Sequence, residues 1–572
     1  PNATQLQTIN NATTGNVIIP DKAVALSGTA AVLVEALDGS VTEVTTGNKI
    51  EGNVTITGDN PNATQLKAIN DATNASIIVP SKAVALSGTA AVLKAALAGS
   101  VTEVTSGDKI EGTLTITVEN PALADLQELN TAVNGIIEIH DKTLALNGTA
   151  AALAEALAGT VREVTTGAAI TGNMTLTSDP NATQLQTINN ATAGNVIIPN
   201  AGITLSGTPA VLVEALTGSV ATAGNAKISG TVTISGSNPN ATQLKTINDA
   251  IDGAIVVPSK AVALSGTAAA LVDALAGTVT DSSNAKIEGK VTITGGNPDA
   301  AQLKSINDAT DGAIDIPSKL VALSGNADVL AAALAGTVRE VTSGDKITGN
   351  VTIADTPTEV ELQTINNGTT ASIQIPAANQ TFSAAADVLA EALTGTVTGP
   401  GAAALSGAVT VNNGANTNVA ATLLSTIATG TGGTVTVSAA VNITGDTSEV
   451  IAALDTNGVV AATANIVLSD TPNVGDLKTL NGKTSGSIKI SNGAVTYTES
   501  AVNLAAALDG TVTDGSGNAL TGNMTLNTDP NATQLQTINN GTAGNVIIPD
   551  AAITLSGTPA VLVEALTGSV AT

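Results

Sequence analysis

Apolar residues recur with two different spacings within each stretch of about 60 residues. Over residues 30–37, Val32, Leu33, Ala36 and Leu37 form one apolar stripe at helical spacing. Over residues 53–57, apolar and polar residues alternate one by one, which is typical of a strand with one buried face. The same alternation is found at residues 115–117, 292–294 and 434–436. The pattern therefore predicts short helices that alternate with short strands.

The opening segment, PNATQLQTIN at Pro1, recurs along the whole chain. Its copies begin, at nearly constant spacing with one step of double length, at Pro61, Pro121, Pro180, Pro239, Pro298, Pro357, Pro472 and Pro530. A degenerate copy near residues 416–427 fills the double step. Residues 180–222 and 530–572 are nearly identical, which indicates recent duplication. Each unit divides into two half-units, and each half-unit reads helix, strand, strand.

Residues that favour helix ends mark the borders of these helices. Asn60, Asp179 and Thr356 come shortly before the first helix of a unit, next to a proline, and we expect them to cap it. Thr29 is the expected cap of the second helix. Gly15 and Gly39 are expected to end the two helices in the left-handed conformation. Helices of about two turns do not persist alone, because nucleation costs more than so short a helix returns.

A unit that cannot bury its own apolar face has to stack on its neighbours. The predicted fold is an α/β solenoid with a tandem repeat of about 60 residues, in which stacked short strands are flanked by short helices. Helices need about twice the spacing of strands. We therefore expect them to alternate between two columns, which would explain why two half-units make one repeat. Independent domains on a string and tandem immunoglobulin-like sandwiches are the alternatives; the second needs longer units and an aromatic core.

The expected organisation has three parts. Residues 1–394 are tandem repeats, residues 395–470 are degenerate repeats in the same stack, and residues 471–572 are tandem repeats that end within a unit. A specialised binding module is the alternative for the middle part. The chain begins without methionine, so we expect it to be a piece of a longer polypeptide.

Composition excludes several classes of protein. The 572 residues include no cysteine and one histidine, His140, so thiolate metal sites, disulfides and histidine clusters are excluded. The net charge of −27 argues against nucleic-acid partners, which need a basic face. No apolar run reaches the length of a membrane span. We find no set of nucleophile, base and orienting residue, and expect no enzyme activity.

Carboxylates recur just before the proline that opens a unit. Asp59, Asp179 and Asp355 are therefore candidates for calcium, which prefers oxygen ligands, although no EF-hand or glycine-rich nonapeptide is present. Helix capping is the alternative explanation. No other cofactor is expected.

The remaining candidates have ordinary structural explanations beside functional ones. Residues 430–433, Gly-Thr-Gly-Gly, precede a predicted strand, whereas phosphate loops open a helix. Thr-x-Thr pairs such as Thr55 and Thr57 suggest ice binding or ordinary strand propensity. Asn-x-Thr triplets, as at Asn53, match glycosylation acceptors or turns and caps. His140 replaces a turn proline, and the other two notable side chains, Phe382 and Tyr497, are expected to fill local gaps.

The tandem unit NATQLQTIN…VIIP…ALSGTAAVLVEAL…NVTITG and the acidic composition, free of cysteine and rich in Ala, Thr, Gly and Val, resemble giant repetitive bacterial cell-surface proteins. These include the large cell-surface motility protein of swimming marine cyanobacteria and related repeat adhesins. The resemblance implies an extracellular or cell-surface structural protein that forms a rod, filament or coat and is adhesive in some members. Implied partners are further copies of the chain, laterally or end to end, and the cell envelope through regions beyond this chain. A glycan- or calcium-binding adhesin module, an ice-binding solenoid and a polysaccharide lyase are the alternatives.

Overall fold

The computed structural model describes all residues, Pro1–Thr572. The chain forms two compact units, one of residues Pro1–Ser265 and Ala270–Gly289, the other of Gly266–Ala269 and Lys290–Thr572. Both are built from the same coil, one helix followed by two strands, and two coils make one repeat unit. This is the predicted α/β solenoid.

The helices are 5 to 10 residues long, apart from one 3-10 turn at Pro400–Ala402 and one π-turn at Ala452–Thr456. Their bounds are α1 Ala3–Asn11, α2 Ala30–Leu37, α3 Ala63–Ala72, α4 Ala90–Leu97, α5 Leu123–Ala132, α6 Ala150–Ala156, α7 Ala182–Ala191, α8 Pro209–Leu216, α9 Ala241–Ala250, α10 Ala268–Leu275, α11 Ala300–Ala309, α12 Ala327–Leu334, α13 Glu359–Gly368, α14 Ala386–Leu393, α15 Ala421–Thr429, α16 Thr447–Ile451, α17 Val474–Asn481, α18 Ala501–Ala507, α19 Ala532–Gly541 and α20 Pro559–Leu566.

The strands are two to four residues long. Their bounds are β1 Val17–Ile19, β2 Leu26–Gly28, β3 Val41–Glu43, β4 Val54–Ile56, β5 Ile77–Val79, β6 Leu86–Gly88, β7 Val101–Glu103, β8 Leu114–Ile116, β9 Ile137–Ile139, β10 Leu146–Gly148, β11 Val161–Glu163, β12 Met174–Leu176, β13 Val196–Ile198, β14 Leu205–Gly207, β15 Val220–Thr222, β16 Val232–Ile234, β17 Ile255–Val257, β18 Leu264–Gly266, β19 Val279–Asp281, β20 Val291–Ile293, β21 Ile314–Ile316, β22 Leu323–Gly325, β23 Val338–Glu340, β24 Val351–Ile353, β25 Ile373–Gln374, β26 Phe382–Ala384, β27 Val397–Thr398, β28 Val409–Val411, β29 Asn418–Ala420, β30 Val435–Val437, β31 Asn442–Gly445, β32 Asn465–Leu468, β33 Ile488–Ile490, β34 Tyr497–Glu499, β35 Val512–Asp514, β36 Met524–Leu526, β37 Val546–Ile547 and β38 Val570–Ala571.

The first helix of a unit begins later than the sequence predicts. In α3 the cap is Asn62, which follows the proline; its side chain accepts from the backbone N–H of Gln65, and the Gln65 side chain accepts from the N–H of Asn62. The same capping box stands at α7, α9 and α19. The prediction that Asn60, Asp179 and Thr356 cap these helices is therefore wrong. The intervening proline is buried just ahead of the cap instead of occupying the first turn.

The second helix follows the sequence prediction more closely. The Thr29 side chain accepts from the backbone N–H of Val32 and caps α2, and Thr89, Thr149 and Thr208 do the same in later units. Gly39 has the predicted left-handed conformation, with φ of 76°. The prediction for Gly15 is wrong, because Gly15 is not among the residues with positive φ, and α1 ends at Asn11 without a left-handed residue.

The core lies between the helices and the strands of each coil. Most strands show an inner, outer, inner pattern of burial, as the alternation predicts. Helix α2, the second helix of the first unit, buries four residues. Two of them, Leu33 and Ala36, have no exposed surface. Almost all buried side chains are Ala, Val, Ile or Leu. Each coil is therefore thin, and its apolar surface is covered only when the next coil stacks on it.

Strand pairing is parallel throughout the sheets, but the strand that comes first in one coil does not always pair with the strand that comes first in the next. Within a unit, β2 pairs with β4, Leu26 opposite Val54. Across the unit border, β4 pairs with β5, Val54 opposite Ile77, so the first strand of the new unit lies beside the last strand of the old one. Sheets of four strands result, ordered β2-β4-β5-β7, then β6-β8-β9-β11, then β10-β12-β13-β15. Each sheet therefore shares two coils with the next.

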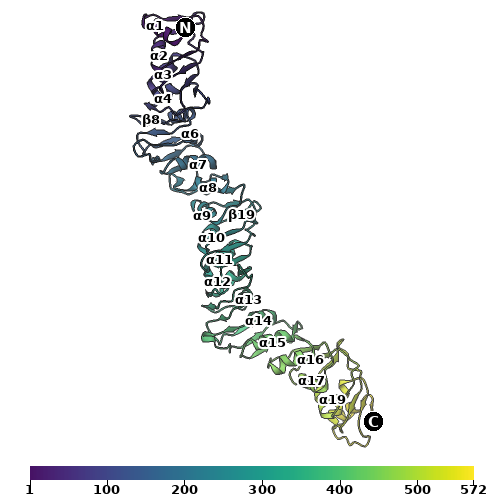
Figure 1. Ribbon diagram of the computed structural model, residues 1–572. Coiled ribbons are helices and arrows are strands. Elements are labelled where there is room, and N and C mark those ends of the chain that lie inside the picture. Colours follow the sequence, from purple (N-terminus) through teal and green to yellow (C-terminus); the bar gives the residue numbers. More distant parts are fainter. The chain divides into compact units, whose positions relative to one another are not determined.

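Consecutive helices pack directly on one another, α1 on α2, α2 on α3 and α3 on α4 (Figure 1). The prediction of two alternating helix columns is therefore wrong. The double length of the repeat unit has another cause. Within a unit, strands of the same rank in their coils pair with each other, as β2 does with β4. At each unit border, the second strand of one coil pairs with the first strand of the next coil, as β4 does with β5. Only two coils together therefore form a repeating element.

Residues 395–470 keep the plan of helix and strands with local changes. Strand β29 is added ahead of α15, which gives a sheet of five strands, β29-β31-β32-β33-β35. The preceding sheet, β26-β28-β30, has three strands and continues only as a single bridge between Thr436 and Val460. Side-chain amides connect the added strand to its neighbours, because Asn442 donates to Asn418 at 3.1 Å and Asn465 donates to Asn442 at 3.2 Å.

Candidate functional site

The three calcium candidates occupy separate, exposed positions. Asp59 and Asp179 are exposed, and neither side chain accepts a hydrogen bond. Asp355 is also exposed, and its Oδ1 accepts from the N–H of Ala327, the first residue of α12, at 2.7 Å. Ser178 and Asn413 do the same for the first residues of α6 and α14. Asp355 therefore caps α12, the helix that opens its own coil. No group of three or more His, Asp or Glu side chains is placed to hold a metal ion.

The other candidates also fall on elements of the repeat. His140 is exposed in the bend that follows β9. Gly433, in the glycine-rich segment, lies against the neighbouring coil, where an added Cβ would stand 1.9 Å from the carbonyl oxygen of Gly407. This close approach explains the glycine without a phosphate.

The threonine pairs do not form a continuous array. Thr55 lies between Ser27 and Ile78 on the outer face of its sheet. Asn53 is exposed ahead of β4.

The two aromatic side chains belong to the core. Phe382 and Tyr497 stand at the strand position that Leu26 has in the first unit, and both are buried. The Tyr497 hydroxyl donates to the carbonyl oxygen of Pro472 at 3.0 Å, and burial raises the pKa of Tyr497 to about 12. The two side chains fill the core in the drifted copies, as the sequence predicts.

A column of asparagine side chains, which we did not anticipate, joins the two helices of each regular unit. In the fourth unit, Asn189 on α7 donates from Nδ2 to the carbonyl oxygen of Glu214 at 2.7 Å and also to that of Thr217, at the open end of α8. Carbonyls at this end of a helix lack partners within the helix itself. The equivalent donors are Asn10, Asn70, Asn130, Asn248, Asn307, Asn366, Asn481 and Asn539.

Replacing Asn189 with alanine is expected to lower the free energy of unfolding by about 1–2 kcal/mol, since the end of α8 loses its partner. The measurement is the urea midpoint together with hydrogen exchange of α8 amides. Asn190→Ala serves as the control. Asn190 is exposed and donates only to the Glu214 carboxylate at 3.0 Å, so we expect about 0.5 kcal/mol or less. Equal losses for the two variants would contradict a capping role.

Glutamates at the end of the third strand of a unit organise the following turn. The Glu163 carboxylate accepts from the N–H groups of Thr165 and Thr166, both at 2.7 Å, and from the Thr166 hydroxyl at 2.6 Å. Hydrogen bonds from Thr166 and Thr165 lower the pKa of Glu163 from 4.5 to about 2. Glu43 is held in the same way and its pKa is also about 2. Equivalent turns lower the pKa values of two further members of this set, Glu103 and Glu340.

These pKa values predict loss of stability in acid. A carboxylate whose pKa is lower in the folded chain than in the unfolded chain stabilises the fold above the unfolded value, and this contribution is lost as the pH falls through the folded value. We expect urea midpoints that are constant above about pH 5 and decrease between about pH 4.5 and 2. The urea midpoint of Glu163→Gln, measured by circular dichroism, should decrease less over this pH range than the midpoint of the unsubstituted chain. An equal decrease would show that Glu163 does not contribute.

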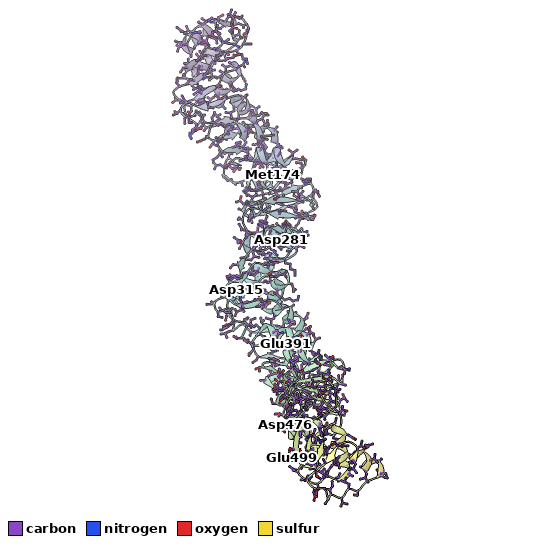
Figure 2. The ribbon with its side chains drawn as sticks, turned by 90° about the vertical axis from the view of Figure 1, so that its right-hand side faces the viewer. Met174, Asp281, Asp315, Glu391, Asp476 and Glu499 are labelled. Carbon is purple, nitrogen blue, oxygen red and sulfur yellow. The ribbon has the colours of Figure 1, made fainter.

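Two grooves recur at equivalent positions three units apart. One, of about 440 Å³, runs beside Arg162 on β11 and helix α7. The other, of about 560 Å³, runs beside Arg339 on β23 and helix α13. These are the only two arginines of the chain. Each pairs with an acidic residue on the adjacent strand, Glu138 at 2.8 Å and Asp315 at 3.0 Å. Figure 2 labels Asp315.

None of the helices has both the length and the apolar character that crossing a membrane requires. No protein-family model matches the chain, and no curated protein matches it either. Among solved structures, the chain has a partial likeness to a plant peptide hormone receptor, RGFR1, in complex with RGF2, with 10% sequence identity and a TM-score of 0.16. That match covers 96% of this chain and 84% of the receptor chain.

Proposed function

We propose that this chain is a structural repeat segment of an extracellular or cell-surface protein, and that it serves as a filament, stalk or coat with an adhesive role. The observation that supports the proposal is the uniform distribution of stabilising contacts. The asparagine column recurs in every regular unit and the apolar core in every coil, whereas reactive side chains are not concentrated at any one place. Such a chain transmits mechanical load along its length, because each coil is held by its neighbours.

Composition supports a location outside the cell. With no cysteine or tryptophan and two methionines, the chain offers oxidants few targets. Its 20 lysines and arginines give trypsin-like proteases few cleavage sites, and the net charge of −27 favours solubility. No catalytic role and no cofactor form part of the proposal.

Electron microscopy of the purified chain tests the structural role. We expect extended particles of uniform width that associate laterally or end to end, and sedimentation with a high frictional ratio that is retained in EDTA. Compact globules, or beads that separate after limited proteolysis into stable fragments of one repeat unit, would contradict it. Antibody labelling of intact source cells tests the location, and label that appears only after the cells are permeabilised would contradict a surface role.

A further inference from the structure

The groove beside Arg339 differs from its counterpart beside Arg162 in its charges. Lys346 lines the first, and Ala169 stands at the equivalent place in the second. Arg162 uses both Nε and Nη2 on the Glu138 carboxylate, whereas Arg339 donates to Asp315 from Nε alone, at 3.0 Å. Asp315 also binds Lys290 at 3.0 Å. The terminal nitrogens of Arg339 therefore keep donors available for a ligand.

No acidic side chain lines this groove, in a chain whose net charge is −27. Carboxylates on the adjoining elements already have hydrogen-bond or ion-pair partners. Glu340 accepts from the N–H groups of Thr342 and Ser343, and Asp345 pairs with Lys319 at 2.5 Å. Glu391, also labelled in Figure 2, accepts from the side-chain amides of α13, each at 2.8 Å. The lining of the groove thus contains two positively charged side chains, Arg339 and Lys346, and no carboxylate.

The remaining lining groups suit a hydroxylated ligand. Gln363 and Asn367 donate their N–H₂ groups to Glu391, which leaves their carbonyl oxygens as acceptors. Thr337, an exposed residue, also lines the groove. The volume of about 560 Å³ lies within the range of small-ligand sites. The guanidinium fork of Arg339 suits a carboxylate, which can accept two parallel hydrogen bonds from it.

Lys346 supplies a second positive charge. Its Nζ donates to the backbone carbonyl oxygen of Asn367 at 2.7 Å, a neutral acceptor that holds the ammonium beside α13 without cancelling its charge. An ammonium has three donors, so two of them remain for a ligand. The side chain is therefore positioned at the groove before any ligand arrives.

We propose that this groove binds an acidic saccharide through a uronate carboxylate held by Arg339 and Lys346, with sugar hydroxyls on Gln363, Asn367 and Thr337. The inference deepens the proposed adhesive role and rests on it. Since no aromatic side chain lines the groove to stack on a sugar ring, single-site affinity is modest. Attachment to a polysaccharide therefore depends on many copies of the protein acting together.

Isothermal titration of the full chain with trigalacturonate tests the proposal. We expect binding that weakens as salt is raised and that is lost, at least tenfold, in Arg339→Gln. Lys346→Ala, at an exposed position, should weaken binding several-fold and provides a second variant should the first fail to fold. Arg162→Gln is the matched control and should bind within twofold of the unsubstituted chain.

No heat of binding, or equal affinity in Arg339→Gln with an unchanged circular dichroism spectrum, would overturn the assignment. Equal affinity for a neutral galactose trimer, or for a sulfated trimer of equal charge, would overturn the uronate specificity. Electron microscopy of Arg339→Gln separates the two proposals. If Arg339→Gln forms normal filaments but does not bind uronate, the structural role stands. If the unsubstituted chain binds uronate but forms no filaments, the assignment of the groove stands and the structural role is refuted.

Discussion

Replacing Leu330 with alanine is expected to destabilise the surrounding coils by about 3 kcal/mol, as for other fully buried leucines. Leu330 has no exposed surface, and its helix, α12, packs against α11, α13 and strand β22. The core here consists of Ala, Val, Leu and Ile side chains, which are too short to close the cavity. The measurement is hydrogen exchange of amides in α11–α13, together with the urea midpoint.

Leu320 provides a control in the same unit. It is 72% exposed, so Leu320→Ala should change the free energy of unfolding by about 0.5 kcal/mol or less. Because each coil is stabilised by its neighbours, exchange in Leu330→Ala should also accelerate in the coils on both sides. Acceleration confined to α11 and α12, without an effect in the neighbouring units, would show that units fold independently and would contradict the shared core.

Gly230→Ala is expected to cost about 3 kcal/mol or more through backbone crowding. A Cβ at this position would stand 2.0 Å from the carbonyl oxygen of Ile203 and 2.6 Å from that of Gly202, both in the preceding coil. Backbone atoms cannot move aside by changing a rotamer, so the two coils would have to separate. Urea midpoints and exchange of the β14 and β16 amides measure the effect. The same close approach is made in other units by Gly112, Gly172, Gly289 and Gly522.

Gly224→Ala is the matched control in the same coil. Thr222 Oγ1, at 3.9 Å, is the nearest atom to a Cβ there, and Gly224 does not have positive φ. We expect a change of about 0.5 kcal/mol in either direction. If both variants unfold at the same urea concentration, close packing of the coils through glycine is refuted.

Local features of the fold could be predicted from the sequence because they depend on neighbouring residues. The stripe at residues 30–37 corresponds to α2, and the alternation at residues 53–57 to β4. Strand pairing could not be predicted in this way. Val54 lies opposite Leu26 of its own unit on one side and Ile77 of the next unit on the other, and the sequence around Val54 does not indicate that its second neighbour is a first strand. The two-column interpretation failed for this reason.

The asparagine column could have been inferred from the repeats themselves. Asn189 and its equivalents are asparagine in every regular copy, whereas the following residue is Asn, Asp, Thr or Gly. A side chain retained among otherwise variable neighbours indicates a specific hydrogen bond. The grooves left a weaker signal, because Arg162 and Arg339 stand out only when all copies are compared. Calcium at the three carboxylates that precede a unit, Asp59, Asp179 and Asp355, stays a prediction.

The displacement of strand position at each unit border limits how such a gene can change length. Recombination between copies that removes or inserts a whole unit restores every pairing, since the new junction repeats an existing one. An exchange of a single half-unit would bring β3-type and β5-type strands to the wrong neighbours and leave backbone donors unpaired. Length variants in natural populations should therefore differ by whole units and never by half of one, as the near-identity of residues 180–222 and 530–572 already suggests.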